Sequence, residues 1–329
     1  MGTYPGISSD SFRHPLDREA EQALRNIPGF ELVARKFIEF VYERPRFIYL
    51  MGNAIQVGSR QYANLYHIFR DCVRDLDVSP EPSLFISHDP FANANSLGQE
   101  RPVVVLNSGL LDLLDEDELR VVFAHELGHI KCGHTTLNQM AIWAIRAVSG
   151  LASMTMGLSS FISTALLAGF YEWARKAELS ADRAALLLSD DPKPVLRTMM
   201  KMTGGSVRYG HEVSLDEFLA QAKRYQELDQ EGINQAYKFL LYNDVANRIF
   251  LTHPFTVERV HYLQEWAGSS DYHQIQTGHY LRRTDGGSAD IPVQSSSQSD
   301  NGDVDLLRRE VAALQEEINR IRNQRGDHD

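Results

Sequence analysis

The sequence predicts a mainly helical α+β protein with one small sheet and a separate coiled-coil-like helix near its C-terminal end. Long stretches repeat apolar side chains at intervals of three and four, which is the period of an amphipathic helix. Only residues 83–89 and 101–109 are short β-branched or aromatic runs bounded by turn residues, which is typical of strands. Residues 304–321 follow a polar stretch and have a heptad pattern of their own.

The composition indicates an ordinary globular protein. The 329 residues are 43% hydrophobic and 23% charged, enough for one or two domains, and the net charge of −11 argues against a nucleic-acid partner. Two cysteines, Cys72 and Cys132, cannot form a disulfide framework and favour a reducing compartment. The first residues show no secretory signal, and Gly6 stands where myristoylation of Gly2 would need Ser or Thr. We therefore expect a cytoplasmic protein, with membrane association as the alternative.

Residues 1–80 are predicted to be a helical region that packs on the following domain. One helix face in this region is formed by Tyr62, Leu65, Tyr66, Phe69, Cys72 and Val73. The prolines of "DVSPEP" end this pattern before the first predicted strand. Between the two strands, "PFANANSLGQE" is expected to be irregular or an edge strand.

Two longer helices follow the strands. "DEDELRVVFAHELGHIKCGH" is a helix with Asp115 as its N-cap, acidic residues in its first turn and Gly133 near its end. Residues 171–188 form the second helix, which "DPKP" ends. Helical sequence continues to 268, so we predict a catalytic domain over 81–268, a flexible linker over 269–303 and a final helix over 304–325.

The stretch "HELGHIKCGH" predicts a metal site. His125 and His129 are one helical turn apart on one face, where two neutral imidazoles can hold one zinc ion. Glu126 follows the first histidine and can reach a metal-bound water. The neighbouring residues 121–124 are apolar, so the alternative of two solvated histidines on a surface helix is disfavoured.

His134 is not expected to be the third ligand. On a continuing helix it would lie about 140° from the face of His129. We interpret it as a helix-end histidine that complements the helix dipole, and Cys132 as a small buried filler.

A later helix offers a better third ligand. Glu178 and Asp182 in "AELSAD" share one helix face, which also has the small residues Ala174, Ala181 and Ala185. Glu178 can complete a set of two histidines and one glutamate around one zinc ion per chain, and Asp182 can hold the outer ring nitrogen of a ligand histidine. The alternative is an ordinary acidic helix face.

In this order, "HELGHIKCGH", "ELSAD" and "THPFTVERV" (252–260) resemble the HtpX and CaaX-prenyl-protease family of zinc peptidases, which are gluzincins. The resemblance covers about 80–265 and implies a zincin-like catalytic domain. It assigns zinc to His125, His129 and Glu178, and the general base to Glu126.

The resemblance also implies two further roles. The histidine matching His253 is thought to steady the transition-state oxyanion, although from sequence alone His253 could simply precede a helix with Pro254 at its first position. "NANSLG" is similar to the family's substrate-facing edge segment, so Asn93, Ala94 and Asn95 are expected to contact the substrate.

Many members of that family are integral membrane proteins, and residues 147–170 of this chain contain no charge. A single membrane span there would place His125 and His129 on one side and Glu178 on the other, so they could not share one zinc ion. We therefore expect buried or site-covering helices in a soluble enzyme, with peripheral membrane contact through 147–170 as an alternative.

The predicted function is that of a zinc metallo-endopeptidase acting on polypeptides. An aminopeptidase would need an acidic cluster for the substrate amine, and no second motif supplies one. A proteolytically silent zinc-stabilised scaffold that binds partners through its C-terminal helix is the other alternative, but a structural site needs no base such as Glu126.

The C-terminal pattern predicts self-association. Its apolar positions are spaced as an a/d seam of Val304, Leu307, Val311, Leu314, Ile318 and Ile321. β-Branched a positions with mostly leucine d positions favour a parallel dimer. An amphipathic tail helix packed on its own domain is equally compatible with this short seam, so a homo-oligomer through 304–321 is one of two expectations.

Overall fold

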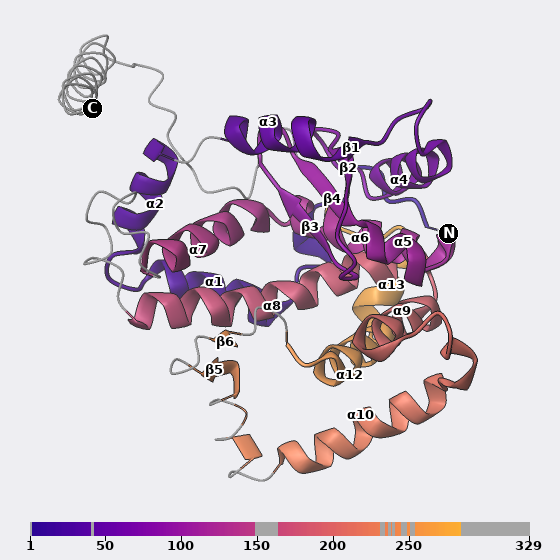
Figure 1. The fold of residues 1–329 in the computed structure, drawn as a ribbon. Helices are drawn as coiled ribbons and strands as arrows, with labels where there is room; N and C mark the ends of the chain where they lie inside the picture. The colour runs from indigo at the N-terminus through magenta and orange to yellow at the C-terminus, as the bar shows by residue number, and fades with distance from the viewer. Residues whose placement is uncertain are drawn as a thin grey trace, which may run out of the picture. The chain divides into compact units, whose positions relative to one another are not determined.

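Figure 1 shows the computed structural model of the protein, which describes residues 2–40, 43–148, 164–230, 234–235, 238, 241–244, 249–250 and 254–283. All of these residues belong to one compact unit, Met1–Gly287. The second unit, Ser288–Asp329, lies outside the described residues. The heptad seam at 304–321, the helix at 304–325 and self-association through them therefore remain predictions.

The main sheet has four strands in the order β1-β2-β4-β3. These strands are β1 (Ile55–Gln56), β2 (Ser83–Ser87), β3 (Ala94–Leu97) and β4 (Val103–Asn107). The two predicted strands are β2 and β4, which run parallel and whose central side chains are buried. The segment between them contains β3, which pairs antiparallel with β4 and has no other partner among the described strands. β5 (Asn243–Asp244) and β6 (Ile249–Phe250) form a separate two-stranded sheet.

Helices make up most of the rest, so the expected mainly helical α+β class is confirmed. Among the described residues, the α-helices and 3₁₀-helices are η1 (Ser9–Ser11), α1 (Pro15–Arg25), α2 (Phe30–Phe40), α3 (Glu43–Asn53), α4 (Ala63–Asp75), α5 (Ser108–Leu113), α6 (Glu116–Lys131), α7 (His134–Val148), α8 (Thr164–Ser189), α9 (Pro192–Gly204), η4 (Gly210–Glu212), α10 (Leu215–Asp229), α12 (Thr256–Ala267) and α13 (Ser270–Gln276).

The close pair of helices α6 and α8 forms the centre of the unit (Figure 1). Asp115 and Glu118 start α6 with a reciprocal capping box, each accepting a hydrogen bond of 3.0 Å from the other's backbone. Where α6 meets α8, a Cβ at Gly128 would lie 2.7 Å from the Ala184 Cβ, so glycine is required for this approach. α6 ends at Lys131, because Gly133 adopts a left-handed φ of 71° before α7 begins.

The N-terminal segment is part of this unit. Backbone hydrogen bonds of 2.8 Å join Ser8 to Leu281 and Arg283 to Gly6, and the Tyr4 hydroxyl donates to the Leu187 carbonyl at 3.1 Å. Figure 1 shows α1 running along α8, and the contacts between the two helices agree. Residues 269–283, which were predicted to begin a flexible linker, instead form α13 and this pairing with the N-terminal segment.

The uncharged segment at 147–170 is described only at its two ends. Residues 149–163 lie outside the described part of the chain, while α7 ends at Val148 and α8 begins at Thr164. None of the described helices combines the length and the apolar character that a membrane crossing requires.

Candidate metal centre

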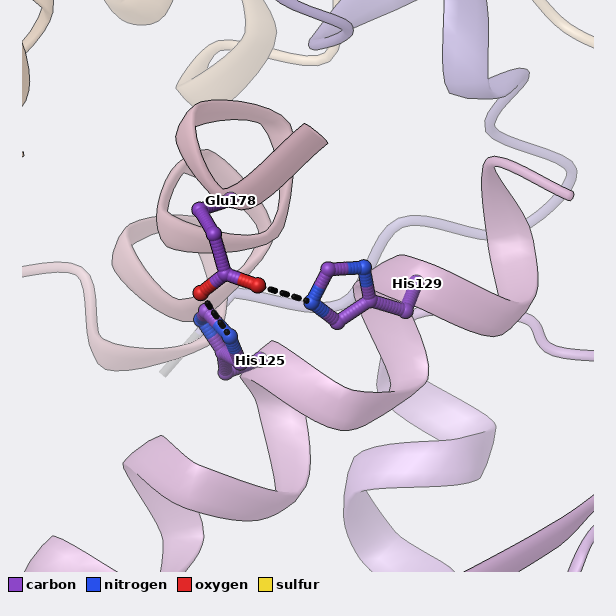
Figure 2. A group of neighbouring side chains, drawn as sticks. All are labelled: His125, His129 and Glu178. Carbon is purple, nitrogen blue, oxygen red and sulfur yellow. Dashed lines mark ion pairs between the residues drawn. The ribbon is translucent and has the colours of Figure 1, made fainter. Parts of the chain in front are cut away.

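His125, His129 and Glu178 meet between α6 and α8, as Figure 2 shows. The His125 Nε2 lies 3.3 Å from one Glu178 carboxylate oxygen, and the His129 Nε2 lies 3.2 Å from the other. One ligand atom from each of the three residues lies within 4.8 Å of the others. The helical period that places both histidines on one face of α6 therefore also aims them at α8.

This donor set fits a divalent metal ion. Two imidazole nitrogens and one carboxylate oxygen are the ligands that catalytic zinc sites use, with a fourth position left for water. His129 and Glu178 are both about 5% exposed, so their polar atoms are directed at one another rather than at bulk water. Polar groups are rarely gathered in this way in an interior unless they have a common partner.

The outer nitrogen of His125 is held by Asp182. The His125 Nδ1 lies 3.1 Å from the Asp182 Oδ1, one turn along α8 from Glu178, which is the place the sequence predicts for this carboxylate. Burial by itself lowers the pKa of His125, but hydrogen bonds to Asp182 and Glu178 outweigh it and raise the pKa to about 10. A metal ion that binds at neutral pH therefore has to displace a proton from this cluster.

Arg259 of α12 completes this side of the site, and sequence reasoning gave it no role. Its Nε and Nη2 donate to the two Asp182 oxygens at 2.8 and 2.6 Å, and its Nη1 lies 3.5 Å from Glu178. Burial tends to raise the pKa of Asp182, but Arg259 and His125 lower it overall and keep the carboxylate ionised. The sequence feature that could have pointed to Arg259 was its positive charge, six residues after His253 in the segment "THPFTVERV".

The outer nitrogen of His129 faces a different partner. Its Nδ1 lies 3.0 Å from the Nδ1 of His134, and the His134 Nε2 lies 2.9 Å from Asp17. His134 is not part of the group of described residues that could hold a metal ion. Its interpretation as a helix-end residue is wrong, because Gly133 ends the first helix and His134 begins α7 with its ring buried against His129. Cys132 is buried, and this burial raises the pKa of its thiol, which fits the role of a filler.

A cavity of about 510 Å³ opens beside the three ligands. Glu126 lines this cavity and is itself buried, with 7% of its surface exposed. Asn93, just before β3, and Ala94 and Asn95, at its start, line another part of the cavity. The Asn95 Oδ1 is buried and has no hydrogen-bond partner among the described residues.

The candidate oxyanion residue His253 lies outside the described residues. The next residue in the chain, Pro254, lines the cavity together with Thr256 and Arg259 of α12. The segment that follows His253 is therefore part of the site, while the role of His253 stays a prediction.

Two histidines and a glutamate on two packed helices, with a second glutamate in the adjoining cavity, define a metallopeptidase of the HExxH class. Comparison with known sequences agrees, because Peptidase family M48 matches residues 59–267. The chain belongs to Peptidase family M48, and it is a metallopeptidase related to the HtpX proteases.

Curated relatives extend the similarity over most of the chain. Plastoglobule-localized metallopeptidase 48, chloroplastic, from Arabidopsis thaliana is 30% identical over 83% of this chain and 76% of its own length. Protease HtpX from Legionella pneumophila (strain Corby) is 27% identical over 64% of this chain and 78% of its own length. A Protease HtpX homolog from a Sulfurihydrogenibium species is 27% identical over 62% of this chain and 74% of its own length.

Proposed function

We propose that the protein is a zinc-dependent endopeptidase that cleaves polypeptides within the cavity beside α6. The observation that supports this most directly is the convergence of His125, His129 and Glu178 beside the buried carboxylate of Glu126. Zinc is the metal we propose, because nitrogen ligands with one carboxylate and an open position are typical of catalytic zinc. Oxygen-rich sites would suit magnesium or calcium better.

A zinc ion held by the three ligands would lower the pKa of a bound water and polarise the scissile carbonyl. Glu126 would accept the proton of the attacking water and then deliver it to the leaving amine. Asp182 and Arg259 would keep His125 in the orientation that directs its Nε2 toward the site. His253 would donate to the oxyanion of the tetrahedral transition state, a role that rests on the family resemblance alone.

The edge strand β3 would hold the substrate backbone. β3 pairs with β4 along one edge and has no described strand along the other, so an extended peptide can add there. The buried Asn95 Oδ1 can accept a hydrogen bond from a substrate amide. We propose Asn93, Ala94 and Asn95 as the residues that contact the peptide, because all three line the cavity.

Cleavage within the chain is favoured over removal of N-terminal residues. An aminopeptidase needs a spare carboxylate near the metal to bind the substrate amine. The acidic residues in the described lining are Glu126, Glu178 and Asp182, and each has a role in the proposed mechanism. The remaining charged residue in that lining besides Arg259 is Arg46, whose charge would repel a substrate amine.

Digestion of an unfolded protein such as casein tests this proposal. We expect internal fragments, identified by mass spectrometry, that disappear with a chelator and return when zinc is added. Stepwise loss of N-terminal residues would instead favour an aminopeptidase. Loaded protein that produces no fragments from any unfolded substrate would favour the zinc-stabilised scaffold.

A further inference from the structure

We propose that Asp17 and His134 are positioning residues for the metal ligand His129, acting as a buried relay from the N-terminal helix α1 to the metal site. The inference rests on the proposed zinc function. Asp17 precedes His134 by 117 residues in the chain, yet it lies two hydrogen bonds from the proposed metal ligand His129.

The relay consists of three buried residues from three helices. The His129 Nδ1 of α6 lies 3.0 Å from the His134 Nδ1 of α7, and the His134 Nε2 lies 2.9 Å from the Asp17 Oδ2 of α1. His134 is 1% exposed and Asp17 is fully buried. The His134 ring also meets the Trp173 ring edge to face at 5.7 Å, which limits its rotation.

The positions of the ring hydrogens follow from these contacts. Two ring nitrogens 3.0 Å apart share one hydrogen, so one of them donates and the other accepts. The Asp17 carboxylate can only accept, so the hydrogen of a neutral His134 is on Nε2 and its Nδ1 is an acceptor. His129 must then place its own hydrogen on Nδ1, which leaves the Nε2 lone pair for the metal ion.

The Asp17 carboxylate is held in place for this task. Arg13 donates to both of its oxygens, at 2.7 and 3.0 Å, and the Ser180 hydroxyl donates to Oδ2 at 2.7 Å. Ser180 itself accepts from the His14 backbone at 2.9 Å, and it lies on α8 between Glu178 and Asp182. The anchor of the relay is therefore connected to the helix that supplies the third metal ligand.

The two histidine ligands thus have different outer partners. His125 is held directly by the carboxylate of Asp182, whereas His129 is held by an imidazole that is itself held by a carboxylate. A buried histidine and aspartate could instead serve only to stabilise the fold. Zinc affinity distinguishes the two roles. If Asp17 and His134 only stabilise the fold, substituting them would not change the zinc affinity of the protein that remains folded.

The test measures the zinc dissociation constant by competition with a chromophoric chelator. The variants are Asp17→Ala, His134→Phe and the double variant, with Asp17→Asn as a form that preserves the packing volume. Arg18→Gln is the matched control, since Arg18 follows Asp17 on α1 and its side chain pairs instead with Asp10 at the surface. Circular dichroism of each metal-free protein checks the fold.

We expect Asp17→Ala and His134→Phe each to weaken zinc binding by about 10- to 100-fold, which is the usual effect of losing an outer partner. Arg18→Gln should bind zinc as the wild type does. In the His134→Phe background, Asp17→Ala should cause no further loss, because Asp17 reaches His129 only through His134. If Asp17→Ala does not fold, Asp17→Asn replaces it. Its neutral Oδ1 can still accept from His134, so the loss of zinc affinity should be smaller, but it should again vanish in the His134→Phe background.

Two results would overturn the relay. One is wild-type zinc affinity in the folded Asp17 and His134 variants. The other is an Asp17 substitution that weakens zinc equally with and without His134, which would mean that it acts through the fold. Failure of the proposed function looks different, because the wild-type protein itself would then bind no zinc.

Discussion

Arg259 donates two hydrogen bonds, of 2.8 and 2.6 Å, to Asp182, and this ion pair joins α12 to the metal centre on α6 and α8. Asp182 in turn holds His125 at 3.1 Å. A cation more than seventy residues beyond the aspartate therefore sets the orientation of the first metal ligand. Both side chains are largely buried, so neither could be left there without its partner at low cost.

Removing Arg259 should destabilise the protein strongly. Arg259→Met removes the guanidinium and both of its hydrogen bonds from the buried Asp182 and leaves it only the His125 ring, so we expect the free energy of unfolding to fall by about 3 to 5 kcal/mol. Chemical denaturation of the metal-free proteins measures this change. Arg70→Met is the control, because Arg70 pairs with Glu81 on the surface, and its loss should cost less than about 1 kcal/mol. An equal decrease in the free energy of unfolding in the two variants would show that the buried ion pair stabilises the protein no more than the surface pair does.

Glu178 should be required for zinc. Glu178→Gln replaces a charged ligand oxygen by a neutral amide and should release most of the zinc from the purified protein. Glu172→Gln, on the same helix but half exposed and paired with Arg175, should retain it. Elemental analysis after dialysis gives the zinc content of both. Full zinc content in the Glu178 variant would remove this residue from the ligand set.

Zinc binding should release protons at pH 7. The raised pKa of His125, about 10, means that its ring holds a proton in the metal-free protein at this pH, and zinc must displace it. Affinity should therefore rise with pH from 6 to 9 and fall as the solution is acidified, by about tenfold per pH unit for one proton. Calorimetric titration in two buffers with different ionisation enthalpies measures the release. Identical heats in both buffers would contradict the prediction.

The close approach of α6 to α8 should depend on Gly128. In Gly128→Ala the new Cβ would meet the Ala184 Cβ at 2.7 Å, which forces the two helices apart. We expect a loss of about 1 to 3 kcal/mol in unfolding free energy and weaker zinc binding. The same substitution at Gly52 in α3 meets nothing within 4 Å, so there it should be neutral or stabilising by up to about 1 kcal/mol. Thermal unfolding of the two variants separates crowding from helix propensity.

The parts of the site that follow from local periodicity could be predicted from the sequence. Helical spacing places His125 beside His129 and Glu178 beside Asp182, and small residues on the second helix permit the two to meet. The two strands and the edge position of β3 could also be anticipated, because strand and turn signals are local.

Contacts between distant segments could not be predicted in this way. Asp17 and Arg259 belong to helices whose own patterns show only ordinary charged residues, and their roles appear once α1 and α12 lie against α8. The interpretation of His134 failed because it assumed a continuing helix, whereas the left-handed conformation of Gly133 redirects the chain. Tertiary packing brings such residues together, and a short stretch of sequence gives no information about contacts between distant segments.

The most direct test of the central claim compares the wild-type protein with Glu126→Gln. Both are loaded with zinc, their zinc content is measured, and their rates of digestion of an unfolded protein are compared. We predict that Glu126→Gln keeps about one zinc ion per chain and loses activity by at least about 100-fold, because an amide cannot accept the proton of the attacking water. Digestion at the wild-type rate by a zinc-loaded Glu126→Gln protein would contradict the claim that Glu126 is the base of a metallopeptidase site.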